Sequence, residues 1–312
     1  MSYIARRAFK KTWERVGKED QARIEKLTLP RGVSFRTYRY IENGDPLHTL
    51  SIYWPESKRD EELPVIIDIH GGGWMYGSKE VNRPFDLALA SLGFSVVGLS
   101  YRYCPQTDMK GILQDIFAAV NFAYSKRVEL GLDFTRAFLT GDSAGGQLVG
   151  LVAGMQMVPY LLNYVGVKAF PFRIKAVNFN HAVPYIAQSG FHSAGKLMNK
   201  IGNRELMREL FGGVFKKDRE FTRLGSDIDE LLKEVPSFPP SLVTTSTGDR
   251  SFCWQSEKLY ESLKAKGVDC ELFEVPDERH VYNVINMDKP TGIKANKRIA
   301  DFFRKHQGGD RI

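Results

Sequence analysis

One serine stands between two glycines near the middle of the chain, in the stretch LTGDSAGGQLVG at residues 139–150. Ser143 follows an apolar run and precedes small residues, within the frame Gly-x-Ser-x-Gly. A serine on a tight strand-to-helix turn is exposed as a nucleophile, and the glycines let neighbouring backbone approach closely. Serine is also common at the start of a helix. The motif alone is therefore compatible with a nucleophile and with a helix cap.

A second stretch, DIHGGGWMYG at residues 68–77, favours the nucleophile. Its three consecutive glycines follow an apolar, strand-like run. Such glycines lose much conformational entropy on folding, which is explained if backbone N–H groups must turn toward a ligand. The oxyanion of acyl transfer needs such donors, and losing one raises the barrier by about 2.7–4 kcal/mol. A phosphate-binding loop is the alternative, but Lys79 does not stand where the pattern GxxxxGK[ST] requires a lysine.

A serine nucleophile needs a general base and an acid that orients this base. Among the six histidines, His181 and His280 each follow a predicted strand, and His280 follows the last one. The chain order Ser, Asp, His favours His280. Asp249 stands after a strand and a glycine, whereas Asp277 shares a short loop with His280 and could hardly reach the far side of its ring. We predict His280 as the base and Asp249 as its partner.

The elements that would position these residues alternate between strand and helix. The apolar runs VIIDI, FSVVGLS, RAFLTG, IKAVNFN and SLVTTST predict strands, and helical patterns lie between most of them. This alternation predicts a mainly parallel sheet with helices on both faces. Two earlier stretches, VSFRTYRY and LHTLSIYW, alternate apolar and polar residues and predict an antiparallel pair at the sheet edge.

Two segments fall outside this alternation and suggest how the chain is divided. Residues 1–30 predict a helical segment of their own. Residues 184–236 contain helical patterns and no buried strand, which predicts an insertion between two strands of the sheet. The core then has a first part, residues 31–183, and a second part, residues 237–312.

Positive charge is concentrated at the start of the chain. Residues 1–31 hold nine Lys and Arg against four Asp and Glu, while the whole chain carries +7. Phe9, Trp13 and Val16 recur there at helical spacing, which indicates a basic amphipathic helix that packs on the body or binds a membrane surface. The remainder is nearly balanced, so we expect no nucleic-acid partner.

Other compositional features exclude several classes of protein. No run reaches the roughly 18 apolar residues of a membrane span, so we expect no stable membrane insertion, and the N-terminus has no signal-peptide pattern. Three scattered cysteines favour a reducing compartment, and we expect a cytoplasmic protein. No zinc-type spacing of cysteine and histidine is present, so we expect no metal and no cofactor.

The two motifs HGGGW and GDSAGG, with a late Gly-Asp and a late histidine, resemble the hormone-sensitive-lipase-like group of α/β-hydrolases, which are carboxylesterases and lipases. The resemblance covers most of the chain, roughly residues 60–290. It implies an α/β-hydrolase fold with a helical cap. It also implies these roles: nucleophile Ser143, general base and then acid His280, its partner Asp249, and oxyanion-hole N–H groups of Gly72, Gly73 and Ala144.

The resemblance carries further expectations. Residues 1–30 and 184–236 would cap an acyl pocket, and this pocket would be lined by Trp74, Met75 and Tyr76, for which core packing is the alternative. The stretch YRYCPQ departs from the Tyr-Arg-Leu-Ala-Pro-Glu of the family, yet Arg102, Pro105 and Asp115 keep its pattern, which we interpret as structural.

These observations predict a serine carboxylesterase that hydrolyses short-chain acyl esters of small molecules through an acyl-enzyme. An amidase-type hydrolase with the same triad, such as an arylformamidase or a small-peptide hydrolase, is the alternative. A non-catalytic ligand receptor on the same scaffold is less favoured, because both the serine and the histidine are present. Related enzymes are often dimers, so a homodimer is a further expectation.

Overall fold

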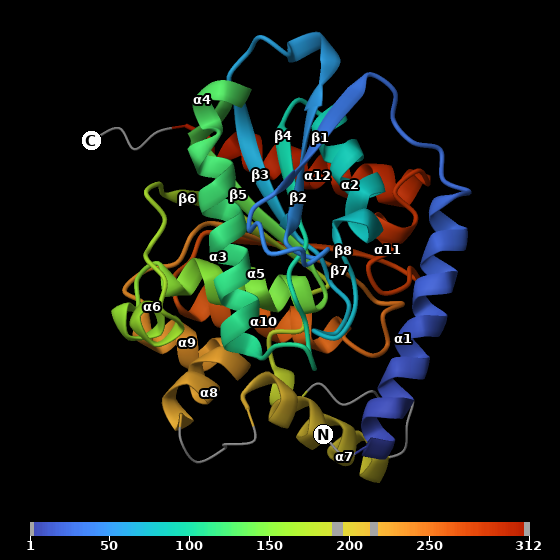
Figure 1. Cartoon of the computed structure of the whole chain (residues 1–312), viewed down its shortest axis with the longest axis vertical. Coiled ribbons are helices and arrows are strands. Elements are labelled where there is room, and N and C mark those ends of the chain that lie inside the picture. Colours follow the sequence, from blue (N-terminus) through green and yellow to red (C-terminus); the bar gives the residue numbers. More distant parts are fainter. Residues whose placement is uncertain (1–2, 189–195, 213–217, 309–312) are drawn as a thin grey trace.

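A computed structural model describes residues 3–188, 196–212 and 218–308. One eight-stranded sheet organises them, in the order β1-β2-β4-β3-β5-β6-β7-β8 (Figure 1). β2 is antiparallel to both of its neighbours, and every other pair is parallel. The predicted parallel sheet and antiparallel edge pair are therefore confirmed. The strands are β1 (Val33–Arg39), β2 (Thr49–Pro55), β3 (Leu63–Ile69), β4 (Ser95–Leu99), β5 (Leu132–Asp142), β6 (Ile174–Asn180), β7 (Ser241–Ser246) and β8 (Cys270–Val275).

Helices cover both faces of the sheet, as its apolar central strands require. Every residue of β3 is buried, which is typical of a parallel strand with both faces covered. Successive side chains of β3 point to opposite faces, so that Val65 and Ile67 join one apolar cluster and Ile66 joins the other. α3 lies in front of the sheet and α12 behind it (Figure 1). The helices of the core are α2 (Lys79–Ser91), α3 (Met109–Ser125), α4 (Arg127–Leu130), α5 (Ala144–Met155), α6 (Pro159–Val165), α10 (Cys253–Ala265), α11 (Tyr282–Ile285) and α12 (Pro290–Lys305).

The remaining helices come from the two segments outside the strand-helix alternation. α1 (Tyr3–Ile24) runs along one side of the molecule, and α7 (Lys196–Leu210) lies near the end of α1 where the chain starts (Figure 1). α8 (Arg219–Ser226) and α9 (Ile228–Glu234) follow α7. Residues 189–195 and 213–217 of the predicted insertion, and the side chain of Phe9, lie outside what the structure describes. By length and composition, no single described helix could cross a membrane; the bent pair of α5 and α6 could do so together.

Candidate active site

The turn between β5 and α5 carries Ser143. β5 ends at Asp142 and α5 begins at Ala144, so the serine occupies the junction with φ 53° and ψ −116°. Its side chain makes no capping hydrogen bond to the helix, which argues against the helix-cap interpretation of the motif. Positive φ in a residue other than glycine is uncommon and occurs often at functional sites. The backbone therefore presents the Ser143 side chain away from the helix.

His280 and Asp249 meet Ser143 at the carboxyl end of the sheet. His280 follows β8 and places Nε2 2.9 Å from Ser143 Oγ. Its Nδ1 lies 2.5 Å from Oδ2 of Asp249, which follows β7. Asp277, the rival acid, is exposed, and its backbone N–H donates to the Thr247 hydroxyl. Three side chains from separate strand ends thus form a continuous line from hydroxyl to carboxylate.

The charge state of Asp249 suits this arrangement. Burial by itself would raise the pKa of Asp249, but hydrogen bonds from His181 and His280 outweigh it and hold the pKa well below its usual range. The carboxylate is therefore ionised at neutral pH and can only accept hydrogen bonds. It follows that His280 carries a proton on Nδ1, which leaves the Nε2 lone pair free to accept the Ser143 hydroxyl proton.

The glycine-rich loop after β3 lies beside Ser143. Gly72 and Gly73 have φ of 111° and 59°, and both line the same cavity as Ser143. A Cβ on Gly72 would stand 2.1 Å from the backbone oxygen of Tyr76, so a side chain there would force the loop apart. Ala144 lies in the first turn of α5, where backbone N–H groups have no partner within the helix. Gly72 and Gly73 thus lie in the wall of the cavity that Ser143 lines, and Ala144 directly follows the serine.

Buried polar groups hold this loop in place. The N–H of Gly71 donates to Oδ1 of Asp142, 3.0 Å away, and Asn82 Nδ2 donates to the same oxygen at 2.7 Å. His70 stacks on Tyr101 with ring centroids 4.2 Å apart. Burial lowers the pKa of His70 to about 4, so its ring is neutral and belongs to the loop rather than to proton transfer. The sequence pattern did not point to Asn82, because nothing in its spacing relates it to Asp142.

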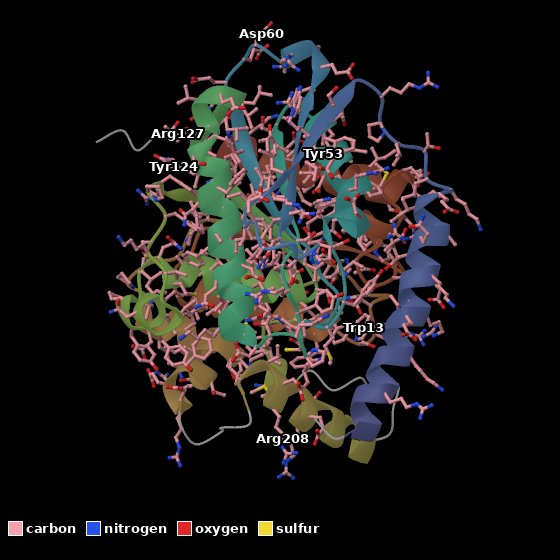
Figure 2. The ribbon with its side chains drawn as sticks, in the orientation of Figure 1. Trp13, Tyr53, Asp60, Tyr124, Arg127 and Arg208 are labelled. Carbon is pink, nitrogen blue, oxygen red and sulfur yellow. The ribbon has the colours of Figure 1, made fainter. Side chains whose placement is uncertain are left out.

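A cavity of about 320 Å³ opens above Ser143. Trp74 and Tyr76 line this cavity, whereas Met75 is not among its lining residues and is buried in the apolar core. Trp13 of α1 points toward the body of the protein and stacks on Tyr76 with ring centroids 5.4 Å apart (Figure 2). The other lining residues include Val16, Val183, Leu206, Phe252, Val284 and Ile285, so the wall is mainly apolar.

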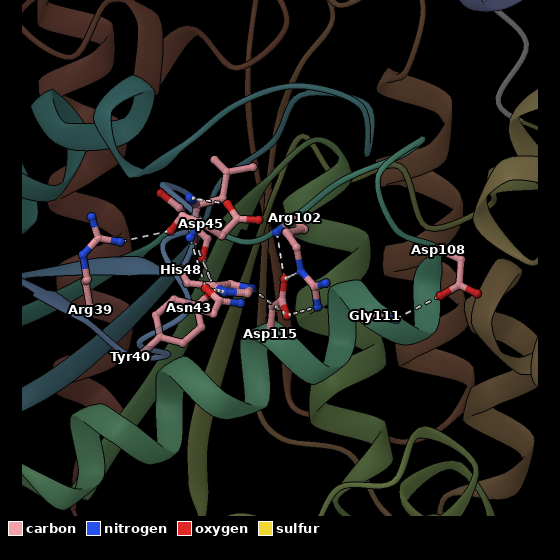
Figure 3. Close-up of polar contacts among 11 residues, drawn as sticks. Arg39, Tyr40, Asn43, Asp45, His48, Arg102, Asp108, Gly111 and Asp115 are labelled. Atoms are coloured by element: carbon pink, nitrogen blue, oxygen red, sulfur yellow. Dashed lines mark hydrogen bonds and ion pairs between the residues drawn. The ribbon is translucent and has the colours of Figure 1, made fainter.

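A second polar cluster lies outside this cavity and has a structural arrangement. Asp115 of α3 accepts two hydrogen bonds from the Arg102 guanidinium, at 2.8 and 2.7 Å, and His48 Nε2 lies 3.3 Å from the same carboxylate (Figure 3). His48 Nδ1 in turn contacts Asn43 Oδ1 at 2.9 Å. The cluster ties the loop after β4 to α3 and to the edge of the sheet. No nucleophilic side chain is part of the described cluster, which agrees with the structural interpretation of Arg102 and Asp115.

Fold and site together define an α/β-hydrolase: a largely parallel sheet, helices on both faces and a serine on the turn between β5 and α5. The chain belongs to the BD-FAE family, whose family model matches residues 50–263. The resemblance to hormone-sensitive-lipase-like α/β-hydrolases is confirmed at this level. A solved esterase from the bacterial hormone-sensitive lipase family has the same fold, with a TM-score of 0.71 at 23% identity over 99% of each chain.

Two further comparisons are with carboxylic ester hydrolases. The crystal structure of esterase B from Lactobacillus rhamnosis superimposes with a TM-score of 0.89, at 30% identity over 97% of this chain and 95% of that one. Isoprenylcysteine alpha-carbonyl methylesterase ICME from Arabidopsis thaliana is 26% identical over 78% of this chain and 56% of its own length. The chain thus spans about half the length of that curated relative.

Proposed function

We propose that the protein is a serine carboxylesterase that hydrolyses short-chain acyl esters through Ser143, His280 and Asp249. The observation that carries the proposal is the unbroken line from Ser143 Oγ to His280 Nε2, at 2.9 Å, and from His280 Nδ1 to Asp249, at 2.5 Å. Such a line is the geometry by which a neutral imidazole activates a serine hydroxyl.

In this mechanism Ser143 Oγ attacks the ester carbonyl while its proton passes to His280 Nε2. The carbonyl oxygen gains the negative charge, and the N–H groups of Gly72, Gly73 and Ala144 stabilise it. The bond to the alcohol then breaks, and the alcohol leaves with the proton from His280. Water repeats the sequence on the acyl-enzyme and releases the acid, which restores Ser143.

The preference for short acyl chains is supported by the size and lining of the cavity. About 320 Å³ bounded mainly by apolar side chains accommodates a small acyl group together with a small alcohol. A second crystal structure of esterase B from Lactobacillus rhamnosis is described as inhibited by a C4-C4 tributyrin phosphonate, and this chain is 30% identical to it. Butyryl esters are therefore the first substrates to test.

We also propose that residues 1–30 and 184–236 form a cap over this cavity. Trp13 and Val16 from α1 and Leu206 from α7 contribute to its wall, which supports a cap built from both segments. Cys104, Cys253 and Cys270 are free thiols in the structure, which supports a reducing compartment such as the cytoplasm. A homodimer stays a prediction from the resemblance.

The test is hydrolysis of p-nitrophenyl esters from acetyl to dodecanoyl by the protein and by its Ser143→Ala variant. We expect activity to peak at short chains and to fall by about 10⁶-fold in the variant. A formylated aromatic amine measured in parallel tests the amidase alternative. Activity that persists in Ser143→Ala would reject the proposed nucleophile, and a higher rate on the amine would reject the ester preference.

A further inference from the structure

Asp249 has a second histidine partner, which the reaction described above does not use. His181 directly follows β6 and is completely buried. Its backbone N–H donates to the Thr244 carbonyl at 2.7 Å, and its φ is 47°. Its Nδ1 lies 3.1 Å from Asp249 Oδ2, the same oxygen that His280 contacts. The two imidazole rings stand edge to face with centroids 5.5 Å apart.

The surroundings of His181 determine its charge. Burial lowers the pKa of His181 to about 4, more than the hydrogen bond with Asp249 raises it, and the nearby His280 lowers it further. The titratable side chains that affect the charge of this ring are Asp249 and His280. The Tyr282 ring packs edge-on against the His181 ring, with centroids 5.4 Å apart. At neutral pH His181 is an uncharged imidazole with one N–H group.

The position of that single proton follows from the two ring nitrogens. Nδ1 faces an ionised carboxylate, which can only accept a hydrogen bond. Nε2 is buried and has no hydrogen-bond partner within the described part of the chain. A proton on Nε2 would leave a buried N–H donor without an acceptor. It would also place the lone pair of Nδ1 next to the negatively charged carboxylate. Both effects favour the proton on Nδ1.

Asp249 Oδ2 consequently receives two N–H donors, one from each histidine. The other carboxylate oxygen, Oδ1, accepts the backbone N–H of Phe252 at 3.2 Å. Hydrogen bonds from the residue that follows β6 and from the residue that precedes α10 thus restrain the carboxylate on both sides. A second donor on Oδ2 also withdraws charge from the oxygen that stabilises the His280 imidazolium.

We propose that His181 is a positioning residue for the catalytic triad: its Nδ1–H orients the Asp249 carboxylate toward His280 and moderates how strongly this carboxylate favours the protonated form of His280. The inference rests on the proposed function, since it assigns His181 a role through Asp249. His181 does not exchange protons with the substrate. It sets the geometry and the charge of the acid on which the base depends.

A matched pair of variants separates the hydrogen bond from packing. Asparagine and leucine have nearly the same shape, and both remove the outer atoms of the ring, but His181→Asn keeps an N–H donor at the position of Nδ1. Asparagine also tolerates positive φ better than leucine. The pH profile of kcat/KM for p-nitrophenyl butyrate is measured for both variants, for the parent protein and for Ser143→Ala, with melting temperatures to follow any loss of stability.

The expected results differ between the two variants. In His181→Leu, kcat falls about 10-fold because the carboxylate loses a donor that orients it. The acid limb of kcat/KM, which reports proton binding by the general base, moves to higher pH. His181→Asn keeps the parent profile and most of the rate. The inference is overturned if the parent protein and both variants have equal rates and equal pH profiles. It is also overturned if both variants lose the same activity and the acid limb of kcat/KM does not move. Either result leaves the role of Ser143 intact. Activity that persists in Ser143→Ala overturns both.

A direct measurement keeps the inference testable if the leucine variant does not fold. NMR spectra of the Ser143→Ala protein with ¹⁵N-labelled histidine report which ring nitrogen carries the proton. The histidine signal that is absent from the spectrum of His181→Asn is the signal of His181. We expect a neutral ring with the proton on Nδ1 from pH 8 down to about 5, since its pKa is about 4. A proton on Nε2 would remove the proposed donor and overturn the inference.

Discussion

At Ser143 the conformation of the backbone is maintained by close contacts on both sides. A Cβ on Gly141 would lie 2.6 Å from the Gly145 carbonyl oxygen, and a Cβ on Gly145 would lie 1.9 Å from the Ile69 oxygen. The two glycines of the motif are thus required because other backbone segments occupy the space of a side chain. The positive φ of Ser143 persists because these contacts leave the turn no room to relax.

Asp142 links this turn to the glycine-rich loop after β3, and we expect Asp142→Ala to slow the reaction. Without the carboxylate, the Gly71 N–H loses its acceptor at 3.0 Å and the loop is less well positioned for the oxyanion. kcat should fall about 10-fold or more, while KM changes little, because the lost interaction acts mainly in the transition state. Steady-state kinetics with p-nitrophenyl butyrate give both constants. Asp142→Asn, which keeps an acceptor oxygen, is the control; an equal loss in this variant would contradict the explanation.

At the scale of elements, the cavity depends on helices that lie outside the sheet. The sheet supplies Ser143, Asp249 and His280 at its carboxyl edge, as ligand sites in open parallel sheets generally lie. α1 and α7 then contribute Trp13, Val16 and Leu206 to the wall. Changes in these two helices should alter which esters fit while leaving the reacting groups in place.

Trp13→Ala tests this separation, and we expect it to shift the preference toward longer acyl chains. The indole packs against the glycine-rich loop after β3, since a Cβ on Gly73 would stand 2.7 Å from Trp13 Cζ2. Removal of the indole enlarges the cavity, and each further CH₂ group of the acyl chain that becomes buried contributes ~0.8 kcal/mol. Because a hexanoyl chain has two more CH₂ groups than a butyryl chain, the ratio of kcat/KM for hexanoyl ester to kcat/KM for butyryl ester should rise about 10-fold. Arg15→Ala, on the exposed side of α1, should leave the ratio unchanged. An unchanged ratio in Trp13→Ala would show that α1 does not limit chain length.

For the whole molecule, the sequence predicted the sheet and the residues that lie around Ser143 more fully than the shape of the cavity. The glycine runs and the order of serine, aspartate and histidine are local signals, so Asp249 and His280 could be selected from the sequence. The sequence could not show whether Met75 lines the cavity or packs in the core, because the direction of a loop side chain depends on what packs against it. His181 follows a predicted strand, as His280 does, but its contact with Asp249 depends on the pairing of β6 with β7, which spacing does not reveal.

The stability of the whole molecule should depend on pH through a buried acidic group near the end of β3, just before the glycine-rich loop. Burial, reinforced by the neighbouring Asp142, raises the pKa of Asp68 to about 8, and burial together with Asp68 also raises the pKa of the adjoining Asp86. Its folded-state pKa exceeds the unfolded value near 3.9, so its contribution to stability is complete below about pH 4 and is lost as pH rises toward 8. Asp68→Asn resembles the protonated acid and keeps an acceptor for Asn82. Its free energy of unfolding relative to the parent should increase by at least about 1 kcal/mol between pH 5 and pH 8. Urea unfolding at both pH values measures this difference, with the exposed Asp301→Asn as the control. A constant difference would mean that folded Asp68 carries no proton in this range and that the adjoining Asp86 holds it instead.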